Sequence, residues 1–193
     1  MRIFSLSFLL VLFSLTTFAA DIEPYFEALK QSGANFEPDG AICEQVARLT
    51  LATQYPDKDF SLASGIEYDA GGMTLGELDV LVINRATQKV VLVTEVKCWK
   101  NLKQALDKVV SQRQRFIWNL TKFPQKMHFV SYSELDLKAE QFDAATEYRS
   151  ISQLGGVKYG FDMELELTLS EFRALRMKLL KCQAWGECAR AAQ

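Results

Sequence analysis

Two carboxylates and one ammonium group interrupt the two most apolar segments of the chain. Asp79 lies in ELDVLVIN, and Glu95 and Lys97 lie in KVVLVTEVK. Charges in such surroundings are costly to bury unless they are paired or bind a metal ion. Two carboxylates beside a backbone carbonyl supply the oxygen ligands that Mg²⁺ prefers, and they leave positions for water and phosphate. A nearby ammonium group can stabilise charge that develops on phosphorus or help to lower the pKa of an attacking water.

This chemistry requires the three side chains to meet. Val, Ile and Leu dominate both segments, which predicts two central strands, at 77–84 and 89–97, that are covered on both faces. A hairpin centred on Thr87 places Asp79 directly opposite Glu95, and Lys97, two residues further on, shares the face of Glu95. The alternative is a solvated salt bridge between the strands, made by Lys97 with either carboxylate.

The rest of the chain predicts a single α/β domain around these strands. Apolar spacing and breaker residues predict helices at 21–30, 40–55 and 101–120, strands at 60–68, 126–132 and 161–169, a glycine-rich turn at 69–76, and a last helix that Ser170 caps and that runs to residue 180. The strand at 161–169 alternates acidic and apolar residues, as an edge strand with one wet face does. Residues 141–157 give no clear pattern.

The motifs resemble those of the PD-(D/E)XK nucleases, and most closely those of the Holliday-junction-resolvase-like branch. GELDVLV at 76–82 and VLVTEVK at 91–97 are similar to the family's Gly-Glu-Ile-Asp and Val-Glu-Val-Lys strands. GAICEQVA at 40–47 matches the helix that carries a glutamate before the first strand, so Glu44 takes that position. Leu78 stands where the name-giving motif has proline, as in many relatives.

The resemblance implies a restriction-endonuclease-like αβββαβ core, with a central mixed sheet flanked by helices, to which this chain adds a C-terminal strand and helix. It also implies hydrolysis of DNA phosphodiester bonds with Mg²⁺ or Mn²⁺. Asp79 and Glu95 would be metal ligands, and Glu44 a further ligand or a water-orienting carboxylate. Lys97 would activate water or stabilise charge.

Basic residues follow the second motif strand. Between residues 97 and 126 eight lysines and arginines are opposed only by Asp107, which is typical of a surface that follows phosphates. The candidate nucleic-acid contacts in this stretch are Lys100, Lys103, Gln104, Gln112 and Arg113. Trp99 is a candidate for stacking on a base. The alternative is an ordinary solvated helix face.

The first residues predict export to the periplasm or the medium. Arg2, an apolar run and small residues around Ala19 form a signal peptide at 1–19, which leaves a mature domain at 20–193 with no stable membrane anchor. The alternative is an uncleaved anchor, because residues 3–20 are just long enough to span a bilayer.

Four cysteines in an exported chain are candidates for disulfides. Cys182 and Cys188 lie six residues apart around Gly186 and are the predicted pair. Cys43 and Cys98 are then bridged or free, and a bridge between them requires Cys98 to lie beyond the regular strand, because a strand residue next to Lys97 points to the opposite face.

Composition narrows the classes of function. The formal net charge of −2 argues against a generally basic nucleic-acid coat protein. His128 is the only histidine, so the chain cannot form a histidine metal cluster. Three hypotheses remain: an exported metal-dependent nuclease, a catalytically silent module of the same fold that binds nucleic acid or protein, and a disulfide-stabilised structural envelope protein. The sequence leaves the oligomeric state open.

Overall fold

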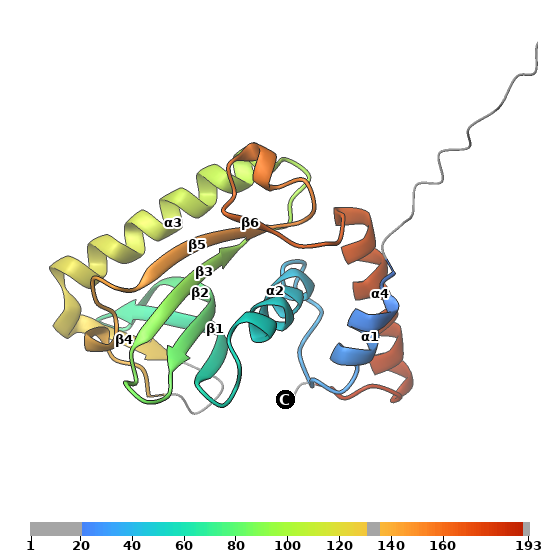
Figure 1. Ribbon diagram of the computed structural model, residues 1–193, viewed down its shortest axis with the longest axis horizontal. Helices are drawn as coiled ribbons and strands as arrows, with labels where there is room; N and C mark the ends of the chain where they lie inside the picture. Colours follow the sequence, from blue (N-terminus) through green and yellow to red (C-terminus); the bar gives the residue numbers. More distant parts are fainter. Residues whose placement is uncertain (1–20, 131–135, 191–193) are drawn as a thin grey trace, which may run out of the picture.

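The computed structural model describes residues 21–130 and 136–190, so the predicted signal peptide at 1–19 lies outside it. Within the described residues the chain forms four α-helices and one six-stranded sheet (Figure 1). The elements are α1 (Glu23–Leu29), α2 (Ala41–Gln54), β1 (Phe60–Ala70), β2 (Met73–Asn84), β3 (Val90–Val96), α3 (Leu102–Lys122), β4 (Met127–Val130), β5 (Glu147–Ser152), β6 (Met163–Glu164) and α4 (Leu169–Trp185). None of the helices described here is long and apolar enough to cross a membrane.

The sheet is mixed, with the strand order β4-β1-β2-β3-β5-β6. β1, β2 and β3 form an antiparallel meander, and β4 adds antiparallel to the free edge of β1. β5 pairs parallel with β3, and β6 pairs parallel with β5. The motif strands β2 and β3 are therefore central, as their continuous apolar sequences predict.

Helices cover both faces of the sheet (Figure 1). On one face, Val80, Val82 and Leu92 pack in a core with residues of α2 and α4. On the other face, Leu81 and Val93 pack in a second core with Phe116 of α3. Successive residues of β2 and β3 thus point into two different cores, which explains why these strands are apolar at adjacent positions.

The glycine-rich turn is shorter than the sequence predicts. β2 begins at Met73, and only Gly71 and Gly72, with φ of 66° and 82°, make the turn. Gly76 lies inside β2, opposite Tyr68 of β1. A Cβ there would stand 2.7 Å from the Tyr68 hydroxyl oxygen, so glycine lets the tyrosine ring cover the strand.

The predicted strand at 161–169 is mostly wrong, and a strand forms in a segment for which the sequence makes no prediction. Residues 141–157, which show no pattern in the sequence, contain the internal strand β5, whereas only Met163–Glu164 of the predicted strand at 161–169 pairs with the sheet. β5 is hard to recognise because two of its buried residues are serines. Ser150 and Ser152 each donate a side-chain hydrogen bond of 2.7 Å, to Asp162 and to the Lys97 carbonyl.

α4 is capped by Thr168, not by Ser170. The Thr168 hydroxyl accepts a hydrogen bond from the Glu171 backbone N–H, and the Glu171 carboxylate accepts one from the Thr168 backbone N–H at 2.7 Å. This reciprocal capping box satisfies two backbone donors, whereas Ser170 is already inside the helix. The helix ends at Gly186, which has a φ of 77°.

Candidate active site

The β2–β3 register is the one that the sequence predicts. Val80 pairs with Thr94 and Leu81 pairs with Val93, so the next step along both strands brings Asp79 opposite Glu95. The regular pairing ends at Val80 and Thr94. The two carboxylates therefore lie where β2 and β3 stop exchanging ladder hydrogen bonds, at a place that both strands help to define.

The side chains of Asp79, Glu95 and Lys97 lie close together in the protein interior. Lys97 Nζ lies 2.8 Å from Asp79 Oδ2 and 3.8 Å from Glu95 Oε2. Only 3% of Asp79 and 4% of Glu95 is exposed. A salt bridge between the strands exists, as the alternative interpretation held, but it is not solvated.

The two carboxylates differ in how well they are satisfied. Asp79 Oδ2 accepts hydrogen bonds from the Lys97 ammonium and, at 2.6 Å, from the backbone N–H of Val96. Glu95 Oε2 is buried and has no hydrogen-bond partner among the described residues. A buried carboxylate oxygen without a partner is costly, so this atom is suited to bind a further cation or donor.

Four acids, which we call the acidic cluster, influence one another here: Glu44, Glu77, Asp79 and Glu95. Burial, and after it the charges of Asp79 and Glu77, raise the pKa of Glu44 to about 8 against the opposing charge of Lys97. Burial and then Asp79 raise the pKa of Glu95 to about 8 against the opposing Lys97 and Arg115. At neutral pH, therefore, the metal-free site favours the protonated forms of Glu44 and Glu95.

Lys97 is the main base inside this cluster. Burial lowers the pKa of its ammonium group, but the charges of Asp79, Glu95 and Glu44 outweigh this effect and leave the pKa above its ordinary value. The lysine is therefore held protonated between carboxylates. In that state it supplies a fixed positive charge and donates hydrogen bonds.

The side chains present here could bind a divalent cation with two carboxylate ligands, not with the three that the sequence predicts. In residues 21–130 and 136–190, no three His, Cys, Asp or Glu side chains group closely enough to hold a metal ion together, so the predicted set of Glu44, Asp79 and Glu95 is not assembled. Mg²⁺ needs only one or two carboxylates, because it keeps several waters and takes phosphate oxygens. Asp79 and Glu95, with the unpartnered Glu95 oxygen, meet that requirement.

The predicted nucleic-acid contacts divide into separate places. Lys100 and Gln104 line a cavity of about 600 Å³ beside the N-terminal end of α3. Lys103 is exposed on α3 outside this cavity. Gln112 is half-buried, and its Oε1 is buried with no hydrogen-bond partner within the described chain. Arg113 lies over the Tyr148 ring, 5.8 Å from its centroid.

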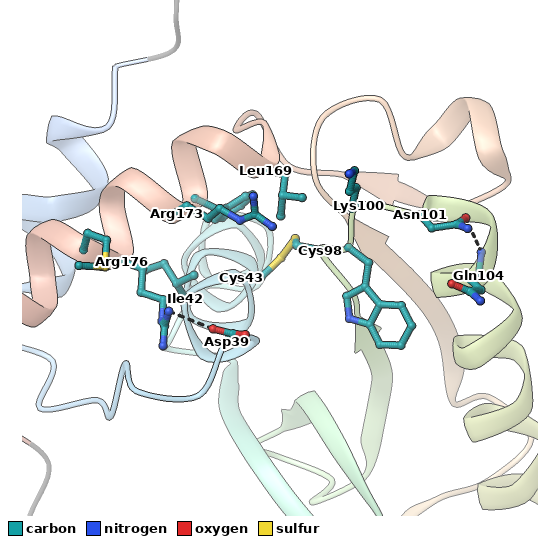
Figure 2. Close-up of a pocket in the computed structure, with 13 residues that line it drawn as sticks. Asp39, Ile42, Cys43, Cys98, Lys100, Asn101, Gln104, Leu169, Arg173 and Arg176 are labelled. Carbon is teal, nitrogen blue, oxygen red and sulfur yellow. Dashed lines mark hydrogen bonds and ion pairs between the residues drawn. A yellow bond between two sulfur atoms is a disulfide. The ribbon is translucent and has the colours of Figure 1, made fainter.

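α4 contributes to this cavity in a way that the sequence did not indicate. Arg173 and Arg176 line it from the side opposite Lys100 and Gln104 (Figure 2). The two sets of residues are about 70 positions apart, and no spacing pattern links them. Only the folding of α4 onto the α2 side of the sheet brings them together.

Two disulfides join the four cysteines. Cys182 pairs with Cys188, as the sequence predicts, with Cα atoms 5.2 Å apart. Cys43 pairs with Cys98, with Cα atoms 6.3 Å apart. This second bridge forms because β3 ends at Val96, so Cys98 lies beyond the regular strand and is free to turn toward α2.

Without metal, we expect the free energy of unfolding to fall as pH rises from about 5 to about 8. The pKa values of Glu44 and Glu95 are raised from 4.5 to about 8 in the folded chain. The folded state therefore binds more protons than the unfolded state in this range. The resulting stability is complete below pH 4.5 and is lost as pH rises through the folded-state pKa, by up to about 1.4 kcal/mol per pH unit for each group.

Urea unfolding in EDTA across this pH range measures the effect. Glu95→Gln should make the decline shallower, because an amide cannot titrate. A wild-type stability that stays flat or rises over the range would contradict the raised pKa values.

Comparisons of the chain with protein-family models, with curated proteins and with solved structures found no match. A function for this protein therefore has to be argued from its own residues and their geometry.

Proposed function

We propose that the protein is an exported, Mg²⁺- or Mn²⁺-dependent nuclease of the PD-(D/E)XK type that hydrolyses phosphodiester bonds of DNA. The observation that carries the proposal is the buried meeting of Asp79, Glu95 and Lys97, with one carboxylate oxygen left unpartnered. A purely structural ion pair has no need of a second, unsatisfied carboxylate. The order α2-β1-β2-β3-α3 around it supports a restriction-endonuclease-like core.

The residues have distinct roles in this proposal. Asp79 and Glu95 would hold the cation, which would polarise the phosphate and lower the pKa of a bound water. Lys97, held protonated by its carboxylate neighbours, stabilises negative charge that develops on the phosphoryl oxygens. Glu44, with a pKa near 8 in the metal-free chain, is suited to exchange a proton with water at neutral pH.

Export belongs to the same proposal. Two disulfides with no cysteine left free in the described chain are compatible with an oxidising compartment, where such bridges persist. The predicted signal peptide at 1–19 supports the same interpretation. The substrate would then be DNA outside the cytoplasm.

One observation favours a second candidate, the catalytically silent module. Lys97 Nζ contacts the Asp79 oxygen that a cation would need, and Glu44 is not grouped with the other carboxylates as a ligand. In a silent module this contact would be permanent. In a nuclease the ammonium would give up part of it when a cation binds.

We expect the mature protein to cleave DNA with Mg²⁺ or Mn²⁺ and to lose this activity fully in EDTA. A bound cation would stabilise the ionised carboxylates of the acidic cluster, so it should also raise the melting temperature, most strongly near pH 8, where Glu44 and Glu95 become charged. Single-stranded, double-stranded and branched substrates should be tested in parallel, with melting curves recorded in the same buffers. Absence of cleavage on all three, together with no shift in melting temperature, would favour the silent module.

A further inference from the structure

The cavity of about 600 Å³ beside the N-terminal end of α3 is bounded by three parts of the fold. Cys43 and Cys98 form its centre, α4 supplies one side, and the segment that leads from β3 into α3 supplies the other (Figure 2). We call it the disulfide groove. Cys43 and Cys98 are neighbours in the sequence of Glu44 and Lys97, so this disulfide joins the two chain segments that carry these candidate active-site residues.

The groove carries positive charge that the described chain leaves uncompensated. Arg176 is already used, because it pairs with Asp39 at 3.0 Å and donates to the Phe36 carbonyl at 2.8 Å. Lys100 and Arg173 are exposed, and neither has a hydrogen-bond or ion-pair partner within residues 21–130 and 136–190. Two cations that face one cavity from opposite sides are suited to bind an anion between them.

The groove also has an aromatic surface. Trp99 is 42% exposed, follows Cys98 in the chain and lines the groove. Its backbone is fixed, because Gln153 donates a hydrogen bond of 2.9 Å to the Trp99 carbonyl. An exposed indole on a fixed backbone, in a groove that cations also line, combines the two features of single-strand recognition, a stacking surface and a phosphate contact.

We infer that the disulfide groove binds a single-stranded nucleotide unit of the substrate, with the base on Trp99 and the phosphate between Lys100 and Arg173. The volume of about 600 Å³ falls within the range of pockets for small ligands and so suits one nucleotide unit. This inference rests on the proposed nuclease function and specifies its substrate: DNA with an unpaired segment. Asn101 and Gln104, on the same side as Trp99, are placed to contact the base edge.

Binding is measured in EDTA, where cleavage does not occur, with a fluorescein-labelled single-stranded oligonucleotide and the full mature chain. Trp99→Ala should weaken binding on the order of tenfold to a hundredfold, and Trp99→Phe should retain most of it. An abasic strand should bind wild type and Trp99→Ala equally.

The phosphate contact is tested by salt dependence. Arg173→Ala should reduce the slope of log Kobs against log salt by about 0.7, as loss of one phosphate contact to a single strand does. Arg48→Ala, which removes an exposed arginine of α2 outside the groove, is the matched control.

The outcomes distinguish a failure of the strand-binding inference from a failure of the proposed nuclease activity. Strand binding that depends on Trp99 and Arg173, without cleavage in Mg²⁺, would support strand binding in the disulfide groove and contradict the proposed nuclease activity. Cleavage by wild type, with unchanged strand affinity in Trp99→Ala and Arg173→Ala, would support the nuclease activity and contradict strand binding in the groove. Equal weakening by Arg48→Ala, or displacement of the strand by a polyglutamate peptide with the same dependence on Trp99, would also overturn it.

Discussion

Replacing Asp79 by Asn or Glu95 by Gln should lower metal-dependent cleavage by about 10³-fold or more, while the protein stays folded. Each substitution removes one of the two carboxylates proposed to hold the cation. Glu95→Gln also removes a buried charge whose oxygen lacks a hydrogen-bond partner in the described chain, so its stability in EDTA at pH 8 should equal or exceed that of wild type. Cleavage rates, calorimetric Mn²⁺ titrations and urea unfolding measure the three effects.

Lys97→Ala, studied in the same experiments, distinguishes the effect of the ammonium charge from that of metal coordination by the carboxylates. It should abolish cleavage but keep cation binding, because the ammonium group is not a ligand. Without Lys97, Asp79 and Glu95 are left buried and uncompensated, which should cost about 3–5 kcal/mol in EDTA and be largely restored by Mg²⁺. Glu187→Gln, a change at an exposed acid of the C-terminal segment, serves as the control. Unchanged cation affinity in Asp79→Asn would show that the ligand assignment is wrong.

Removing the Cys43–Cys98 disulfide, by Cys43→Ala with Cys98→Ala, should lower the free energy of unfolding by about 4 kcal/mol. The bridge closes a loop across a sequence separation of 55 residues, and much of its stabilising effect comes from restricting the unfolded chain. It also ties α2, which carries Glu44, to the end of β3, which leads to Lys97. We therefore expect cleavage to fall as well, at a temperature where the variant remains folded.

The other disulfide provides a matched control. Cys182–Cys188 spans a separation of only 6 residues, so Cys182→Ala with Cys188→Ala should cost about 2 kcal/mol and leave cleavage near the wild-type rate. Alanine is preferred to serine, because Cys43, Cys182 and Cys188 are buried and a hydroxyl there would need a partner. Equal losses in the two double variants would argue against loop length as the source of the difference.

The sequence by itself determined the centre of the candidate site. Asp79, Glu95 and Lys97 lie in neighbouring strands joined by a short hairpin, and their pairing depends only on the turn and on the two-residue repeat of a strand. The same holds for Cys182–Cys188, which needs only six residues to turn back. Such local relations are determined by spacing along the chain, so they could be predicted before any fold was known.

The tertiary structure decided everything that depends on residues far apart in the chain. β5 was missed because Ser150 and Ser152 are buried through hydrogen bonds to distant groups, a compensation that no local apolar pattern reveals. The bridge between Cys43 and Cys98 required β3 to end at Val96. The disulfide groove depends on α4 folding back beside α2, which brings Arg173 to the cavity that Lys100 also lines. Burial and long-range packing, not spacing, set the pKa of Glu95 and the positive charge of the groove.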